Sequence, residues 1–349
     1  MPSGTQRDLP RLEPPLLAWI QAQHPDRAAL RIDSLRHASA GLTNETVLVD
    51  FSWDEGRNVE SLVLRLPAEQ TTFPDFDLAV EARVQETVGR AGVPAPVPAH
   101  YEPDGRWLGA PFLAMPFVAG QVGPQTPAFD PWLTALPPEQ QRRVYDSFLD
   151  VLAEIHRVDT RNDGLGEVLR GAGRTVIDEV AWWEEYTRWA SGGDAPDPIL
   201  VELLAWCRTN APRNEPAPSL LWGDPRLGNA IFDADQRLVA ALDWDMAFIG
   251  PAEHDVGWFL GLDGLMAELA QRRVDGFPSP PDAIVEYEKR SGRPLVDYPW
   301  YEVFALVRSI AITVRQIQIA SDAGVEYLVP PPDRSPVVPY VRKLIARAG

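Results

Sequence analysis

An acid, an amide and a second acid stand close together in one segment of this chain, and their spacing constrains it more than any other feature. From Leu221 the segment reads Leu-Trp-Gly-Asp-Pro-Arg-Leu-Gly-Asn-Ala-Ile-Phe, and a later apolar run ends in Asp-Trp-Asp. Asp224 precedes Asn229 by five residues, and Asp243 follows Asn229 by fourteen. A carboxylate can accept the proton of a hydroxyl, and carboxylate and amide oxygens are ligands that Mg²⁺ prefers. Phosphoryl transfer requires this combination of side chains.

The residues around this set predict a short hairpin. Two apolar runs, 230–232 and 238–242, flank a polar turn, which is the pattern of an antiparallel strand pair. Asp243 then stands at the mouth of the hairpin, where a strand end holds a metal ligand rigidly. Asp245 lies on the same side of an extended chain as Asp243, so it could touch metal or substrate, or face solvent.

Composition narrows the class of protein. With 349 residues, 45% of them hydrophobic, the chain can form one large domain or two lobes. The formal charge of −18 argues against nucleic-acid binding by the surface as a whole. The single cysteine, Cys207, excludes an intramolecular disulfide, and no apolar run is long enough to span a bilayer. We therefore expect a cytoplasmic protein without nucleic-acid or membrane partners, and the composition carries no signal for its oligomeric state.

The order of the expected elements predicts an α+β fold. A helix over 9–24 precedes alternating, strand-like segments near 35–40, 47–51 and 62–66, and a helix over 77–91 follows them. Apolar stripes then predict further helices over 138–158, 262–274, 281–291 and 298–322. We expect a small N-terminal antiparallel-sheet lobe (residues 1–118) and a larger, mainly helical C-terminal lobe (residues 119–349).

Several motifs, in order along the chain, resemble those of the aminoglycoside phosphotransferase-like family, which has a protein-kinase-like fold. The segment LLWGDPRLGNAIF carries the D-x-x-x-x-N spacing of the catalytic loop of such enzymes. Upstream, the chain is similar to a bacterial phosphotransferase branch of the family and to the kinase-like domains fused to acyl-CoA dehydrogenases. The segments that carry this similarity are SAGLTNETVLVDFSW, LVLRLP, VEARVQETVGRAGVPAP, FLAMPFVAGQV and VLAEIHRVD.

The resemblance implies a bilobal kinase that uses ATP, or GTP, together with Mg²⁺. Asp224 would act as the catalytic base, and Asn229 and Asp243 would hold the metal ion. The family fold also needs a cation on the third strand and an acid on the lobe helix. The chain has no lysine before Lys289, so that cation must be an arginine.

Arg65 is the expected cation, because it alternates with the apolar Leu64 and Leu66 and so faces the other side of the sheet. Glu81 is its expected partner, with Glu86 as the alternative. Arg65 could instead be a surface strand residue.

Two further segments would bind the nucleotide if the resemblance holds. The turn that contains Thr43 and Asn44 could cap the phosphates with backbone N–H groups. The segment with Met115 and Phe117 would supply hinge backbone groups to the adenine, although packing of a buried strand would explain the same apolar residues.

One motif position departs from the family. Most members have histidine two residues before the catalytic Asp, where this chain has Trp222; we expect Trp222 to brace the loop by packing. Asp255 resembles a family position that braces the same loop by hydrogen bonds, and we expect His254 to join that network. His156 is expected to be a hydrogen-bonded interior histidine.

Two classes of function remain open. The first is an ATP-dependent phosphotransferase that acts on a hydroxyl of a small molecule. The second is a non-catalytic nucleotide-binding pseudokinase, which the departures at Trp222 and Arg65 allow. The sequence gives little support to an aminoglycoside as the acceptor. Transfer of phosphate from ATP to a small molecule distinguishes the two classes.

Overall fold

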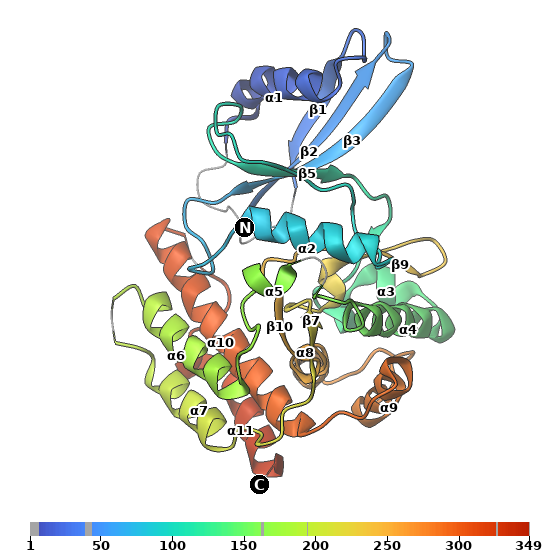
Figure 1. Cartoon of the computed structure of the whole chain (residues 1–349). Helices are drawn as coiled ribbons and strands as arrows, with labels where there is room; N and C mark the ends of the chain where they lie inside the picture. The colour runs from blue at the N-terminus through green and yellow to red at the C-terminus, as the bar shows by residue number, and fades with distance from the viewer. Residues whose placement is uncertain (1–6, 39–43, 162–163, 194, 326, 349) are drawn as a thin grey trace.

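The N-terminal part of the chain forms one antiparallel sheet between two helices. In the computed structural model, which describes residues 7–38, 44–161, 164–193, 195–325 and 327–348, the strand order is β1-β2-β3-β5-β4. The elements are α1 (Leu9–Gln23), β1 (Arg31–His37), β2 (Asn44–Trp53), β3 (Asn58–Pro67), α2 (Leu78–Arg90), β4 (His100–Glu102) and β5 (Phe112–Pro116). Helix α1 lies over one end of the sheet, and α2 lies between the sheet and the helical part (Figure 1).

The side chains of β3 point alternately to the two faces of the sheet, so α1 and α2 can each pack against a different face. Leu64 and Leu66 are fully buried in the cluster that α1 forms with β2 and β5. Successive side chains of a strand point to opposite faces, so Arg65 faces α2 instead. On that side, Leu113 and Met115 of β5 pack against Leu78 and Ala82 of α2.

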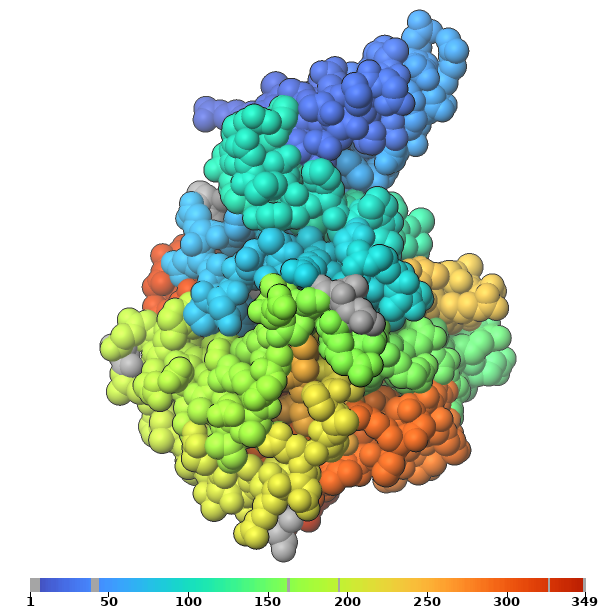
Figure 2. Space-filling view, in the orientation of Figure 1, coloured from blue at the N-terminus to red at the C-terminus, as the bar shows by residue number. Residues whose placement is uncertain are grey.

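The remainder is mainly helical, with two small sheets near its junction with the N-terminal part. Its first elements are β6 (Gln121–Val122), the 3₁₀ turn η1 (Pro127–Phe129), α3 (Pro131–Ala135), α4 (Pro138–Ile155), α5 (Leu165–Val168), α6 (Val176–Ala190) and α7 (Pro198–Thr209). They are followed by β7 (Pro218–Leu221), η2 (Leu227–Asn229), β8 (Ala230–Phe232), β9 (Leu238–Ala241), β10 (Phe248–Pro251), α8 (Glu253–Ala270), α9 (Pro280–Ser291), α10 (Tyr298–Asp322), η3 (Pro332–Arg334) and α11 (Val337–Ala348). Figure 2 shows the narrow N-terminal part standing on this broader helical body. The predicted α+β, bilobal architecture is confirmed, and the division at residues 118 and 119 stays a prediction.

Helix α8 begins nine residues before the predicted helix over 262–274. Its first turns are buried on every side, including Val256, Trp258 and Phe259. A helix without a polar face shows no amphipathic stripe, so the sequence pattern indicated only its exposed end. Gly257 lets α8 approach α10 closely, because a Cβ there would lie 2.7 Å from the Tyr301 backbone carbon.

Within the described part of the chain, α10 is the one helix long and apolar enough to cross a membrane by length and composition. Half of its apolar stretch is buried inside the protein. The helix packs against α6, α7, α8 and α11, which is the environment of a core helix.

A segment of the N-terminal part is anchored on the helical part. Residues 68–77, here called the docking segment, connect β3 to α2. The Tyr186 hydroxyl of α6 donates to the Thr72 carbonyl at 3.0 Å, and Arg315 Nε of α10 donates to the Thr71 carbonyl at 3.0 Å. Phe73 is 7% exposed and belongs to the α6–α7–α10 core cluster. The docking segment therefore joins the two parts at a point separate from the connection through β5 and β6.

Candidate active site

Two loops, each of which follows a strand of one of the two small sheets, form the centre of the site. Strand β7 pairs with β10, and β8 pairs with β9 in the predicted hairpin. The loop after β7 carries Asp224, and the loop after β9 carries Asp243. At Gly223 the φ angle is +89°, and a Cβ would lie 2.0 Å from the Met246 carbonyl oxygen. Only glycine fits there, and it lets the two loops touch.

Asp255, on the first turn of α8, holds the start of the Asp224 loop. Its carboxylate accepts the Trp222 N–H at 2.7 Å and the Gly223 N–H at 3.0 Å. His156 Nε2 lies 3.1 Å from the same carboxylate, and His156 Nδ1 lies 2.7 Å from the Tyr287 hydroxyl. The predicted bracing by Asp255 and the interior position of His156 are confirmed.

Trp222 braces the loop by packing, as predicted. Its ring is fully buried and stacks between Phe148 and Trp244, with centroids 5.6 Å away in both cases. Its indole N–H donates to the Leu242 carbonyl at 2.8 Å, which ties the Asp224 loop to the end of β9.

The prediction that His254 belongs to the bracing network is wrong. His254 is buried against Phe248 of β10 and against Tyr301 and Phe304 of α10. Its Nδ1 finds no hydrogen-bond partner among the described residues. Neighbouring residues of a helix point about 100° apart, so His254 and Asp255 face different parts of the interior.

Asp224 is 8% exposed and both of its oxygens are hydrogen-bonded. Oδ2 accepts Arg226 Nε at 2.7 Å and Asn229 Nδ2 at 2.9 Å, and Oδ1 accepts the Trp258 indole N–H at 2.7 Å. Burial, together with the charge of Asp243, raises the pKa of Asp224, although Arg226 opposes the shift. These surroundings hold the carboxylate in one orientation and make it a better proton acceptor than an exposed aspartate.

Asn229 and Asp243 lie on the two arms of the hairpin. The Leu242 N–H donates to the Asn229 carbonyl at 2.8 Å, which places the residue before Asp243 beside Asn229. The Asn229 side-chain nitrogen donates to Asp224, so its oxygen is the atom that remains for a metal ion. Asp243 adopts φ of +65°, a left-handed conformation that is uncommon outside glycine and costs energy. Such strain at a charged residue is common at functional sites.

The cluster holds more carboxylates than cations. Asp224, Asp243, Asp245 and Glu81 influence one another electrostatically, and Arg65 lies among them. One oxygen of Asp245, Oδ2, is buried without a hydrogen-bond partner among the described residues. Burial and the neighbouring Asp243 raise the pKa of Asp245 well above its usual range. A buried carboxylate in that state requires a cation or a proton.

The oxygen donors of this cluster fit Mg²⁺. In the described part of the chain no three His, Cys, Asp or Glu side chains form a ready-made metal site. Mg²⁺ typically uses one or two carboxylates and completes its shell with substrate phosphates and water. Asp243, Asn229 and the unsatisfied oxygen of Asp245 supply donors of the required kind.

Arg65 lies where the N-terminal and helical parts meet. It is 8% exposed, its Nη1 donates to Glu81, and its Nη2 donates to Asp243 Oδ1 at 2.8 Å. Burial alone would lower the pKa of Arg65, but the Glu81 and Asp243 carboxylates together raise it. Glu86, the alternative partner, instead accepts the Ala99 N–H.

Glu81 connects α2 to the Asp243 loop. Its Oε1 accepts from Arg65, and the backbone N–H of Trp244 lies near enough to affect its pKa, although Oε2 has no hydrogen-bond partner among the described residues. Burial raises the pKa of Glu81 from 4.5 to about 7, although Arg65 and the Trp244 N–H oppose the rise. The charge of Glu81, and with it the grip on Arg65, therefore depends on pH near neutrality.

The other residues expected to bind the nucleotide lie in the turn before β2 and at the end of β5. Thr43 lies outside the described residues, and Asn44 opens β2 at 4% exposure. Met115 is a buried β5 residue whose sulfur lies 3.7 Å from Gln85 Nε2. The Phe117 N–H already donates to the Ser61 carbonyl at 3.0 Å, so only its carbonyl and its 44% exposed ring could contact a base. These roles stay predictions.

Sequence reasoning missed two residues that contact Asp224. Arg226 lies two positions after Asp224 in the same loop, and this closeness in sequence could have indicated the contact between them. Trp258 comes from α8, where the sequence carries no signal for a contact with Asp224. Only the fold brings its indole N–H to the carboxylate.

A second charged residue, Arg308 of α10, is enclosed by aromatic rings behind Trp258. It is 1% exposed, and its guanidinium carbon lies 4.9 Å from the ring centroid of Trp258 and within 5.7–5.9 Å of Trp183, Phe248 and Phe304. None of its three side-chain nitrogens has a hydrogen-bond partner among the described residues. Contacts with ring faces stabilise a cation by about 0.5–2 kcal/mol, whereas burying an unpaired ion costs several kcal/mol. The rings alone therefore do not offset the burial of this charge.

Comparison with known proteins places the chain in a family. The model of the phosphotransferase enzyme family (APH) matches residues 34–292. Human acyl-CoA dehydrogenase family member 11 is 27% identical over 256 residues, which are 70% of this chain and 32% of that protein. The chain thus spans about a third of the length of this curated relative.

Solved structures share the fold. A candidate aminoglycoside phosphotransferase from Ralstonia eutropha superposes with a TM-score of 0.69 at 23% identity and covers 94% of this chain and 98% of that one. The GDP complex of aminoglycoside 2'-phosphotransferase-IIIa superposes with a TM-score of 0.56 at 15% identity and covers 98% of both chains. Because the family model covers most of the chain and these folds agree with it, the chain belongs to the phosphotransferase enzyme family.

Proposed function

We propose that this chain transfers the γ-phosphoryl group of ATP or GTP to a hydroxyl of a small molecule. Asp224 is the base in this proposal, and Asn229 and Asp243 hold Mg²⁺. The observation that carries it is the convergence of these three side chains on one hydrogen-bonded unit, beside an Arg65 that contacts Asp243.

Each side chain has a definite task. The acceptor hydroxyl places its proton on Asp224 while its oxygen forms the bond to the γ-phosphorus, and the bond from that phosphorus to the β–γ bridging oxygen breaks to release the nucleoside diphosphate. Trp258 and Asn229 hold the Asp224 carboxylate toward the acceptor. Arg65, oriented by Glu81, neutralises phosphate charge. When bound, Mg²⁺ supplies charge stabilisation for the phosphate oxygens.

Arg226 adds a positive charge at the point of transfer. Its Nε is bonded to Asp224 and its Nη1 donates to Gln125. A fixed guanidinium at this place stabilises the negative charge that develops on the transferring group. We infer that the Arg226 guanidinium already occupies this position before the substrate binds.

Fold neighbours and the site residues support the proposal that the substrate is a nucleotide. Aminoglycoside 2'-phosphotransferase-IIIa was solved as a GDP complex, and another neighbour, APH(2'')-Ib, with ADP. Both are nucleoside diphosphates, and the Arg65–Glu81 pair suits the phosphates of either. ATP and GTP are therefore both to be tested.

The proposal is tested by thermal unfolding and by product formation. Ligand at about 100-fold its Kd stabilises a protein by roughly 2.7 kcal/mol. Mg·ATP or Mg·GTP should therefore raise the Tm of the wild type by several degrees, and Asp243→Asn should lose the magnesium-dependent part. Asparagine tolerates positive φ nearly as well as aspartate, so this change removes the charge without adding backbone strain. Asp235→Asn, at the exposed far end of the same hairpin, is the matched control.

Turnover is measured as release of nucleoside diphosphate with a panel of hydroxylated small molecules. Asp224→Asn should still bind nucleotide but lose about 100-fold or more in kcat. Nucleotide-dependent stabilisation without turnover on any acceptor would favour the pseudokinase alternative. If neither nucleotide shifts the Tm of the wild type, the proposed site is wrong.

A further inference from the structure

Two arginines lie close together in the interior behind Trp258, where the carboxylates of Glu179, Asp255 and Asp224 also act on Arg308 electrostatically. Arg308 and Arg170 both lie against the Phe248 ring, with their guanidinium carbons 5.9 Å and 4.8 Å from its centroid. Glu179 of α6 also lies in this region, and its carboxylate accepts hydrogen bonds from Arg170 and from the Trp183 indole N–H. Glu179 thus pairs with Arg170, and Arg308 is left with donors and no acceptor among the described residues.

A guanidinium has five N–H donors in one plane and cannot lose its charge at physiological pH. The surrounding rings attract the charge, but an N–H group that points at a ring face forms only a weak hydrogen bond. Buried polar groups in proteins are nearly always paired. The Arg308 donors therefore call for an acceptor from outside the chain, and a carboxylate or a phosphate can accept two parallel hydrogen bonds from one guanidinium.

This unpaired guanidinium lies one indole ring from the proposed base. The Trp258 N–H donates to Asp224 at 2.7 Å, and the Trp258 ring lies under Arg308 at 4.9 Å. Arg308 comes from α10 and Trp258 from α8, on the helical side of Asp224. Arg65 and Glu81, the residues proposed to bind the nucleotide, belong to β3 and α2 of the N-terminal part, so Arg308 and the nucleotide would approach Asp224 from different parts of the molecule.

We propose that Arg308 binds an anionic group, a carboxylate or a phosphate, of the acceptor whose hydroxyl lies at Asp224. The proposal rests on the proposed phosphotransferase function and names its substrate class: a small hydroxylated anion. Arg308 can form a bidentate pair with either group, and that group is unchanged by the reaction.

The binding test uses the full-length protein without nucleotide. The probes are ω-hydroxycarboxylates of three to eight carbons, their uncharged primary amides, and inorganic phosphate, at constant ionic strength. Carboxylates or phosphate should raise the Tm of the wild type, while the amides should not. Whichever anion stabilises more identifies the group that Arg308 takes.

Two variants and one control assign the effect to Arg308. Arg308→Met keeps the volume and removes the charge, and it should weaken anion binding about 10- to 100-fold, as expected for loss of hydrogen bonds to a charged group. Arg308→Lys should recover part of the affinity. Arg342→Met, on the exposed side of α11, should respond to anions like the wild type. Without ligand, Arg308→Met should be as stable as the wild type or more stable, since an unpaired buried charge has been removed.

The kinetic test separates this inference from the proposed function. Arg308→Met should raise the KM of a hydroxycarboxylate about 10- to 100-fold while leaving the KM of the nucleotide unchanged. Equal responses to a carboxylate and its amide, or an anion response that survives in Arg308→Met, would overturn the assignment. Loss of stability in Arg308→Met without any change in anion response would show a structural role only. If Mg·ATP and Mg·GTP fail to bind while the anion response still depends on Arg308, the proposed function fails and the anion site stands.

Discussion

Glu81 and Asp255 are both buried carboxylates, but the chain surrounds them differently. Asp255 accepts two backbone N–H groups and lies beside His156, so its negative charge is matched by fixed donors. Glu81 pairs with Arg65 through one oxygen, its other oxygen has no hydrogen-bond partner among the described residues, and burial raises its pKa to about 7. The first arrangement is a permanent brace. The second is an ion pair in which the Glu81 carboxyl group gains or loses its charge near neutral pH.

We therefore predict that activity rises as pH increases through about 7, because ionised Glu81 is needed to orient Arg65. The effect on stability has the opposite sign. A carboxyl group whose folded pKa lies above its unfolded value stabilises the fold at pH below 4.5, and that contribution is lost as pH rises through about 7. Profiles of kcat/KM and of Tm from pH 5 to 9, for the wild type and Glu81→Gln, test both statements.

Burial raises the pKa of Glu302 to about 7 as well, so the difference between wild type and Glu81→Gln is the quantity to compare. That difference in Tm should change across pH 5 to 8. A difference that stays constant over this range would contradict the assignment.

Asp255→Asn should destabilise the protein by about 2 kcal/mol. The amide keeps one accepting oxygen but places an N–H group against a backbone donor, and a buried donor without an acceptor costs about 1–3 kcal/mol. Urea denaturation measures the change. Asp275→Asn, at an exposed site, should stay within about 0.5 kcal/mol of the wild type.

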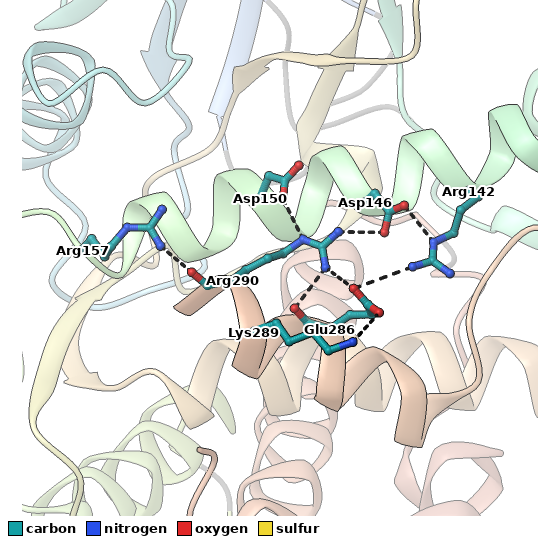
Figure 3. A network of polar contacts seen from close by, with 7 residues as sticks. All are labelled: Arg142, Asp146, Asp150, Arg157, Glu286, Lys289 and Arg290. Atoms are coloured by element: carbon teal, nitrogen blue, oxygen red, sulfur yellow. Dashed lines mark hydrogen bonds and ion pairs between the residues drawn. The ribbon is translucent and has the colours of Figure 1, made fainter. Parts of the chain in front are cut away.

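At the scale of elements, a charged network joins α4 and α9 beside the core that supports His156. Arg290 of α9 donates to Asp150 and Asp146 of α4 at 2.6 and 2.9 Å, and to Glu286 of its own helix at 2.7 Å (Figure 3). Arg142 bonds the other oxygen of Asp146 at 2.8 Å. The Arg290 guanidinium thus pairs with three carboxylates and links the two helices. Its side chain is 19% exposed.

Arg290→Met should cost about 1 kcal/mol at low salt, near the upper end for ion pairs at the surface. The loss should shrink in 1 M NaCl, because the Debye length falls to about 3 Å. Urea denaturation at both salt concentrations measures it. Lys289→Met, whose ammonium group pairs with Glu286 at 3.3 Å on a 66% exposed side chain, should change stability by less than about 0.5 kcal/mol. An equal loss in both variants would show that the Arg290 network adds nothing beyond an ordinary surface pair.

At the scale of the whole molecule, the N-terminal and helical parts are in contact at several places around the candidate site, two of which bear on opening. Arg65 and Glu81 contact the Asp243 loop on one side. The docking segment is fixed to α6 and α10 on the other, through Tyr186 and Phe73. Separation of the two parts must break at least one of these contacts.

Phe73→Ala should therefore destabilise the protein by about 3 kcal/mol, the usual cost of removing a buried phenyl ring. It should also speed nucleotide release, because it loosens the docking segment. Tyr186→Phe removes only the hydrogen bond to the Thr72 carbonyl and should cost about 1 kcal/mol. Urea denaturation and stopped-flow release of a fluorescent nucleotide measure the two effects. Unchanged release in Phe73→Ala would show that the docking segment does not restrain opening.

Local patterns predicted the parts of this molecule that depend on neighbours in sequence. Alternation placed Arg65 opposite Leu64 and Leu66, and two apolar runs gave the hairpin that carries Asp243. The family resemblance added the contact of Arg65 with Glu81 and the bracing by Asp255. In contrast, the start of α8 was missed because the first turns of that helix are buried on every side.

Contacts between segments that are distant in sequence could not be predicted from local sequence patterns. Phe73 finds its partners on α6 and α10, more than a hundred residues later. The aromatic surroundings of Arg308 assemble from α6, β10, α8 and α10. Such arrangements depend on tertiary packing, which the periodicity of single segments does not encode.

Arg65 also decides how visible this protein is to chemical labelling. Reactive nucleotide probes that acylate an amine beside the phosphates need a lysine there, and the guanidinium of Arg65, whose pKa Glu81 and Asp243 raise, is no nucleophile. The two lysines of the chain, Lys289 and Lys343, lie on α9 and α11. A proteome-wide survey with amine-directed probes would pass over this protein even where it is abundant and loaded with nucleotide, and an arginine-directed dicarbonyl would be the reagent to use instead.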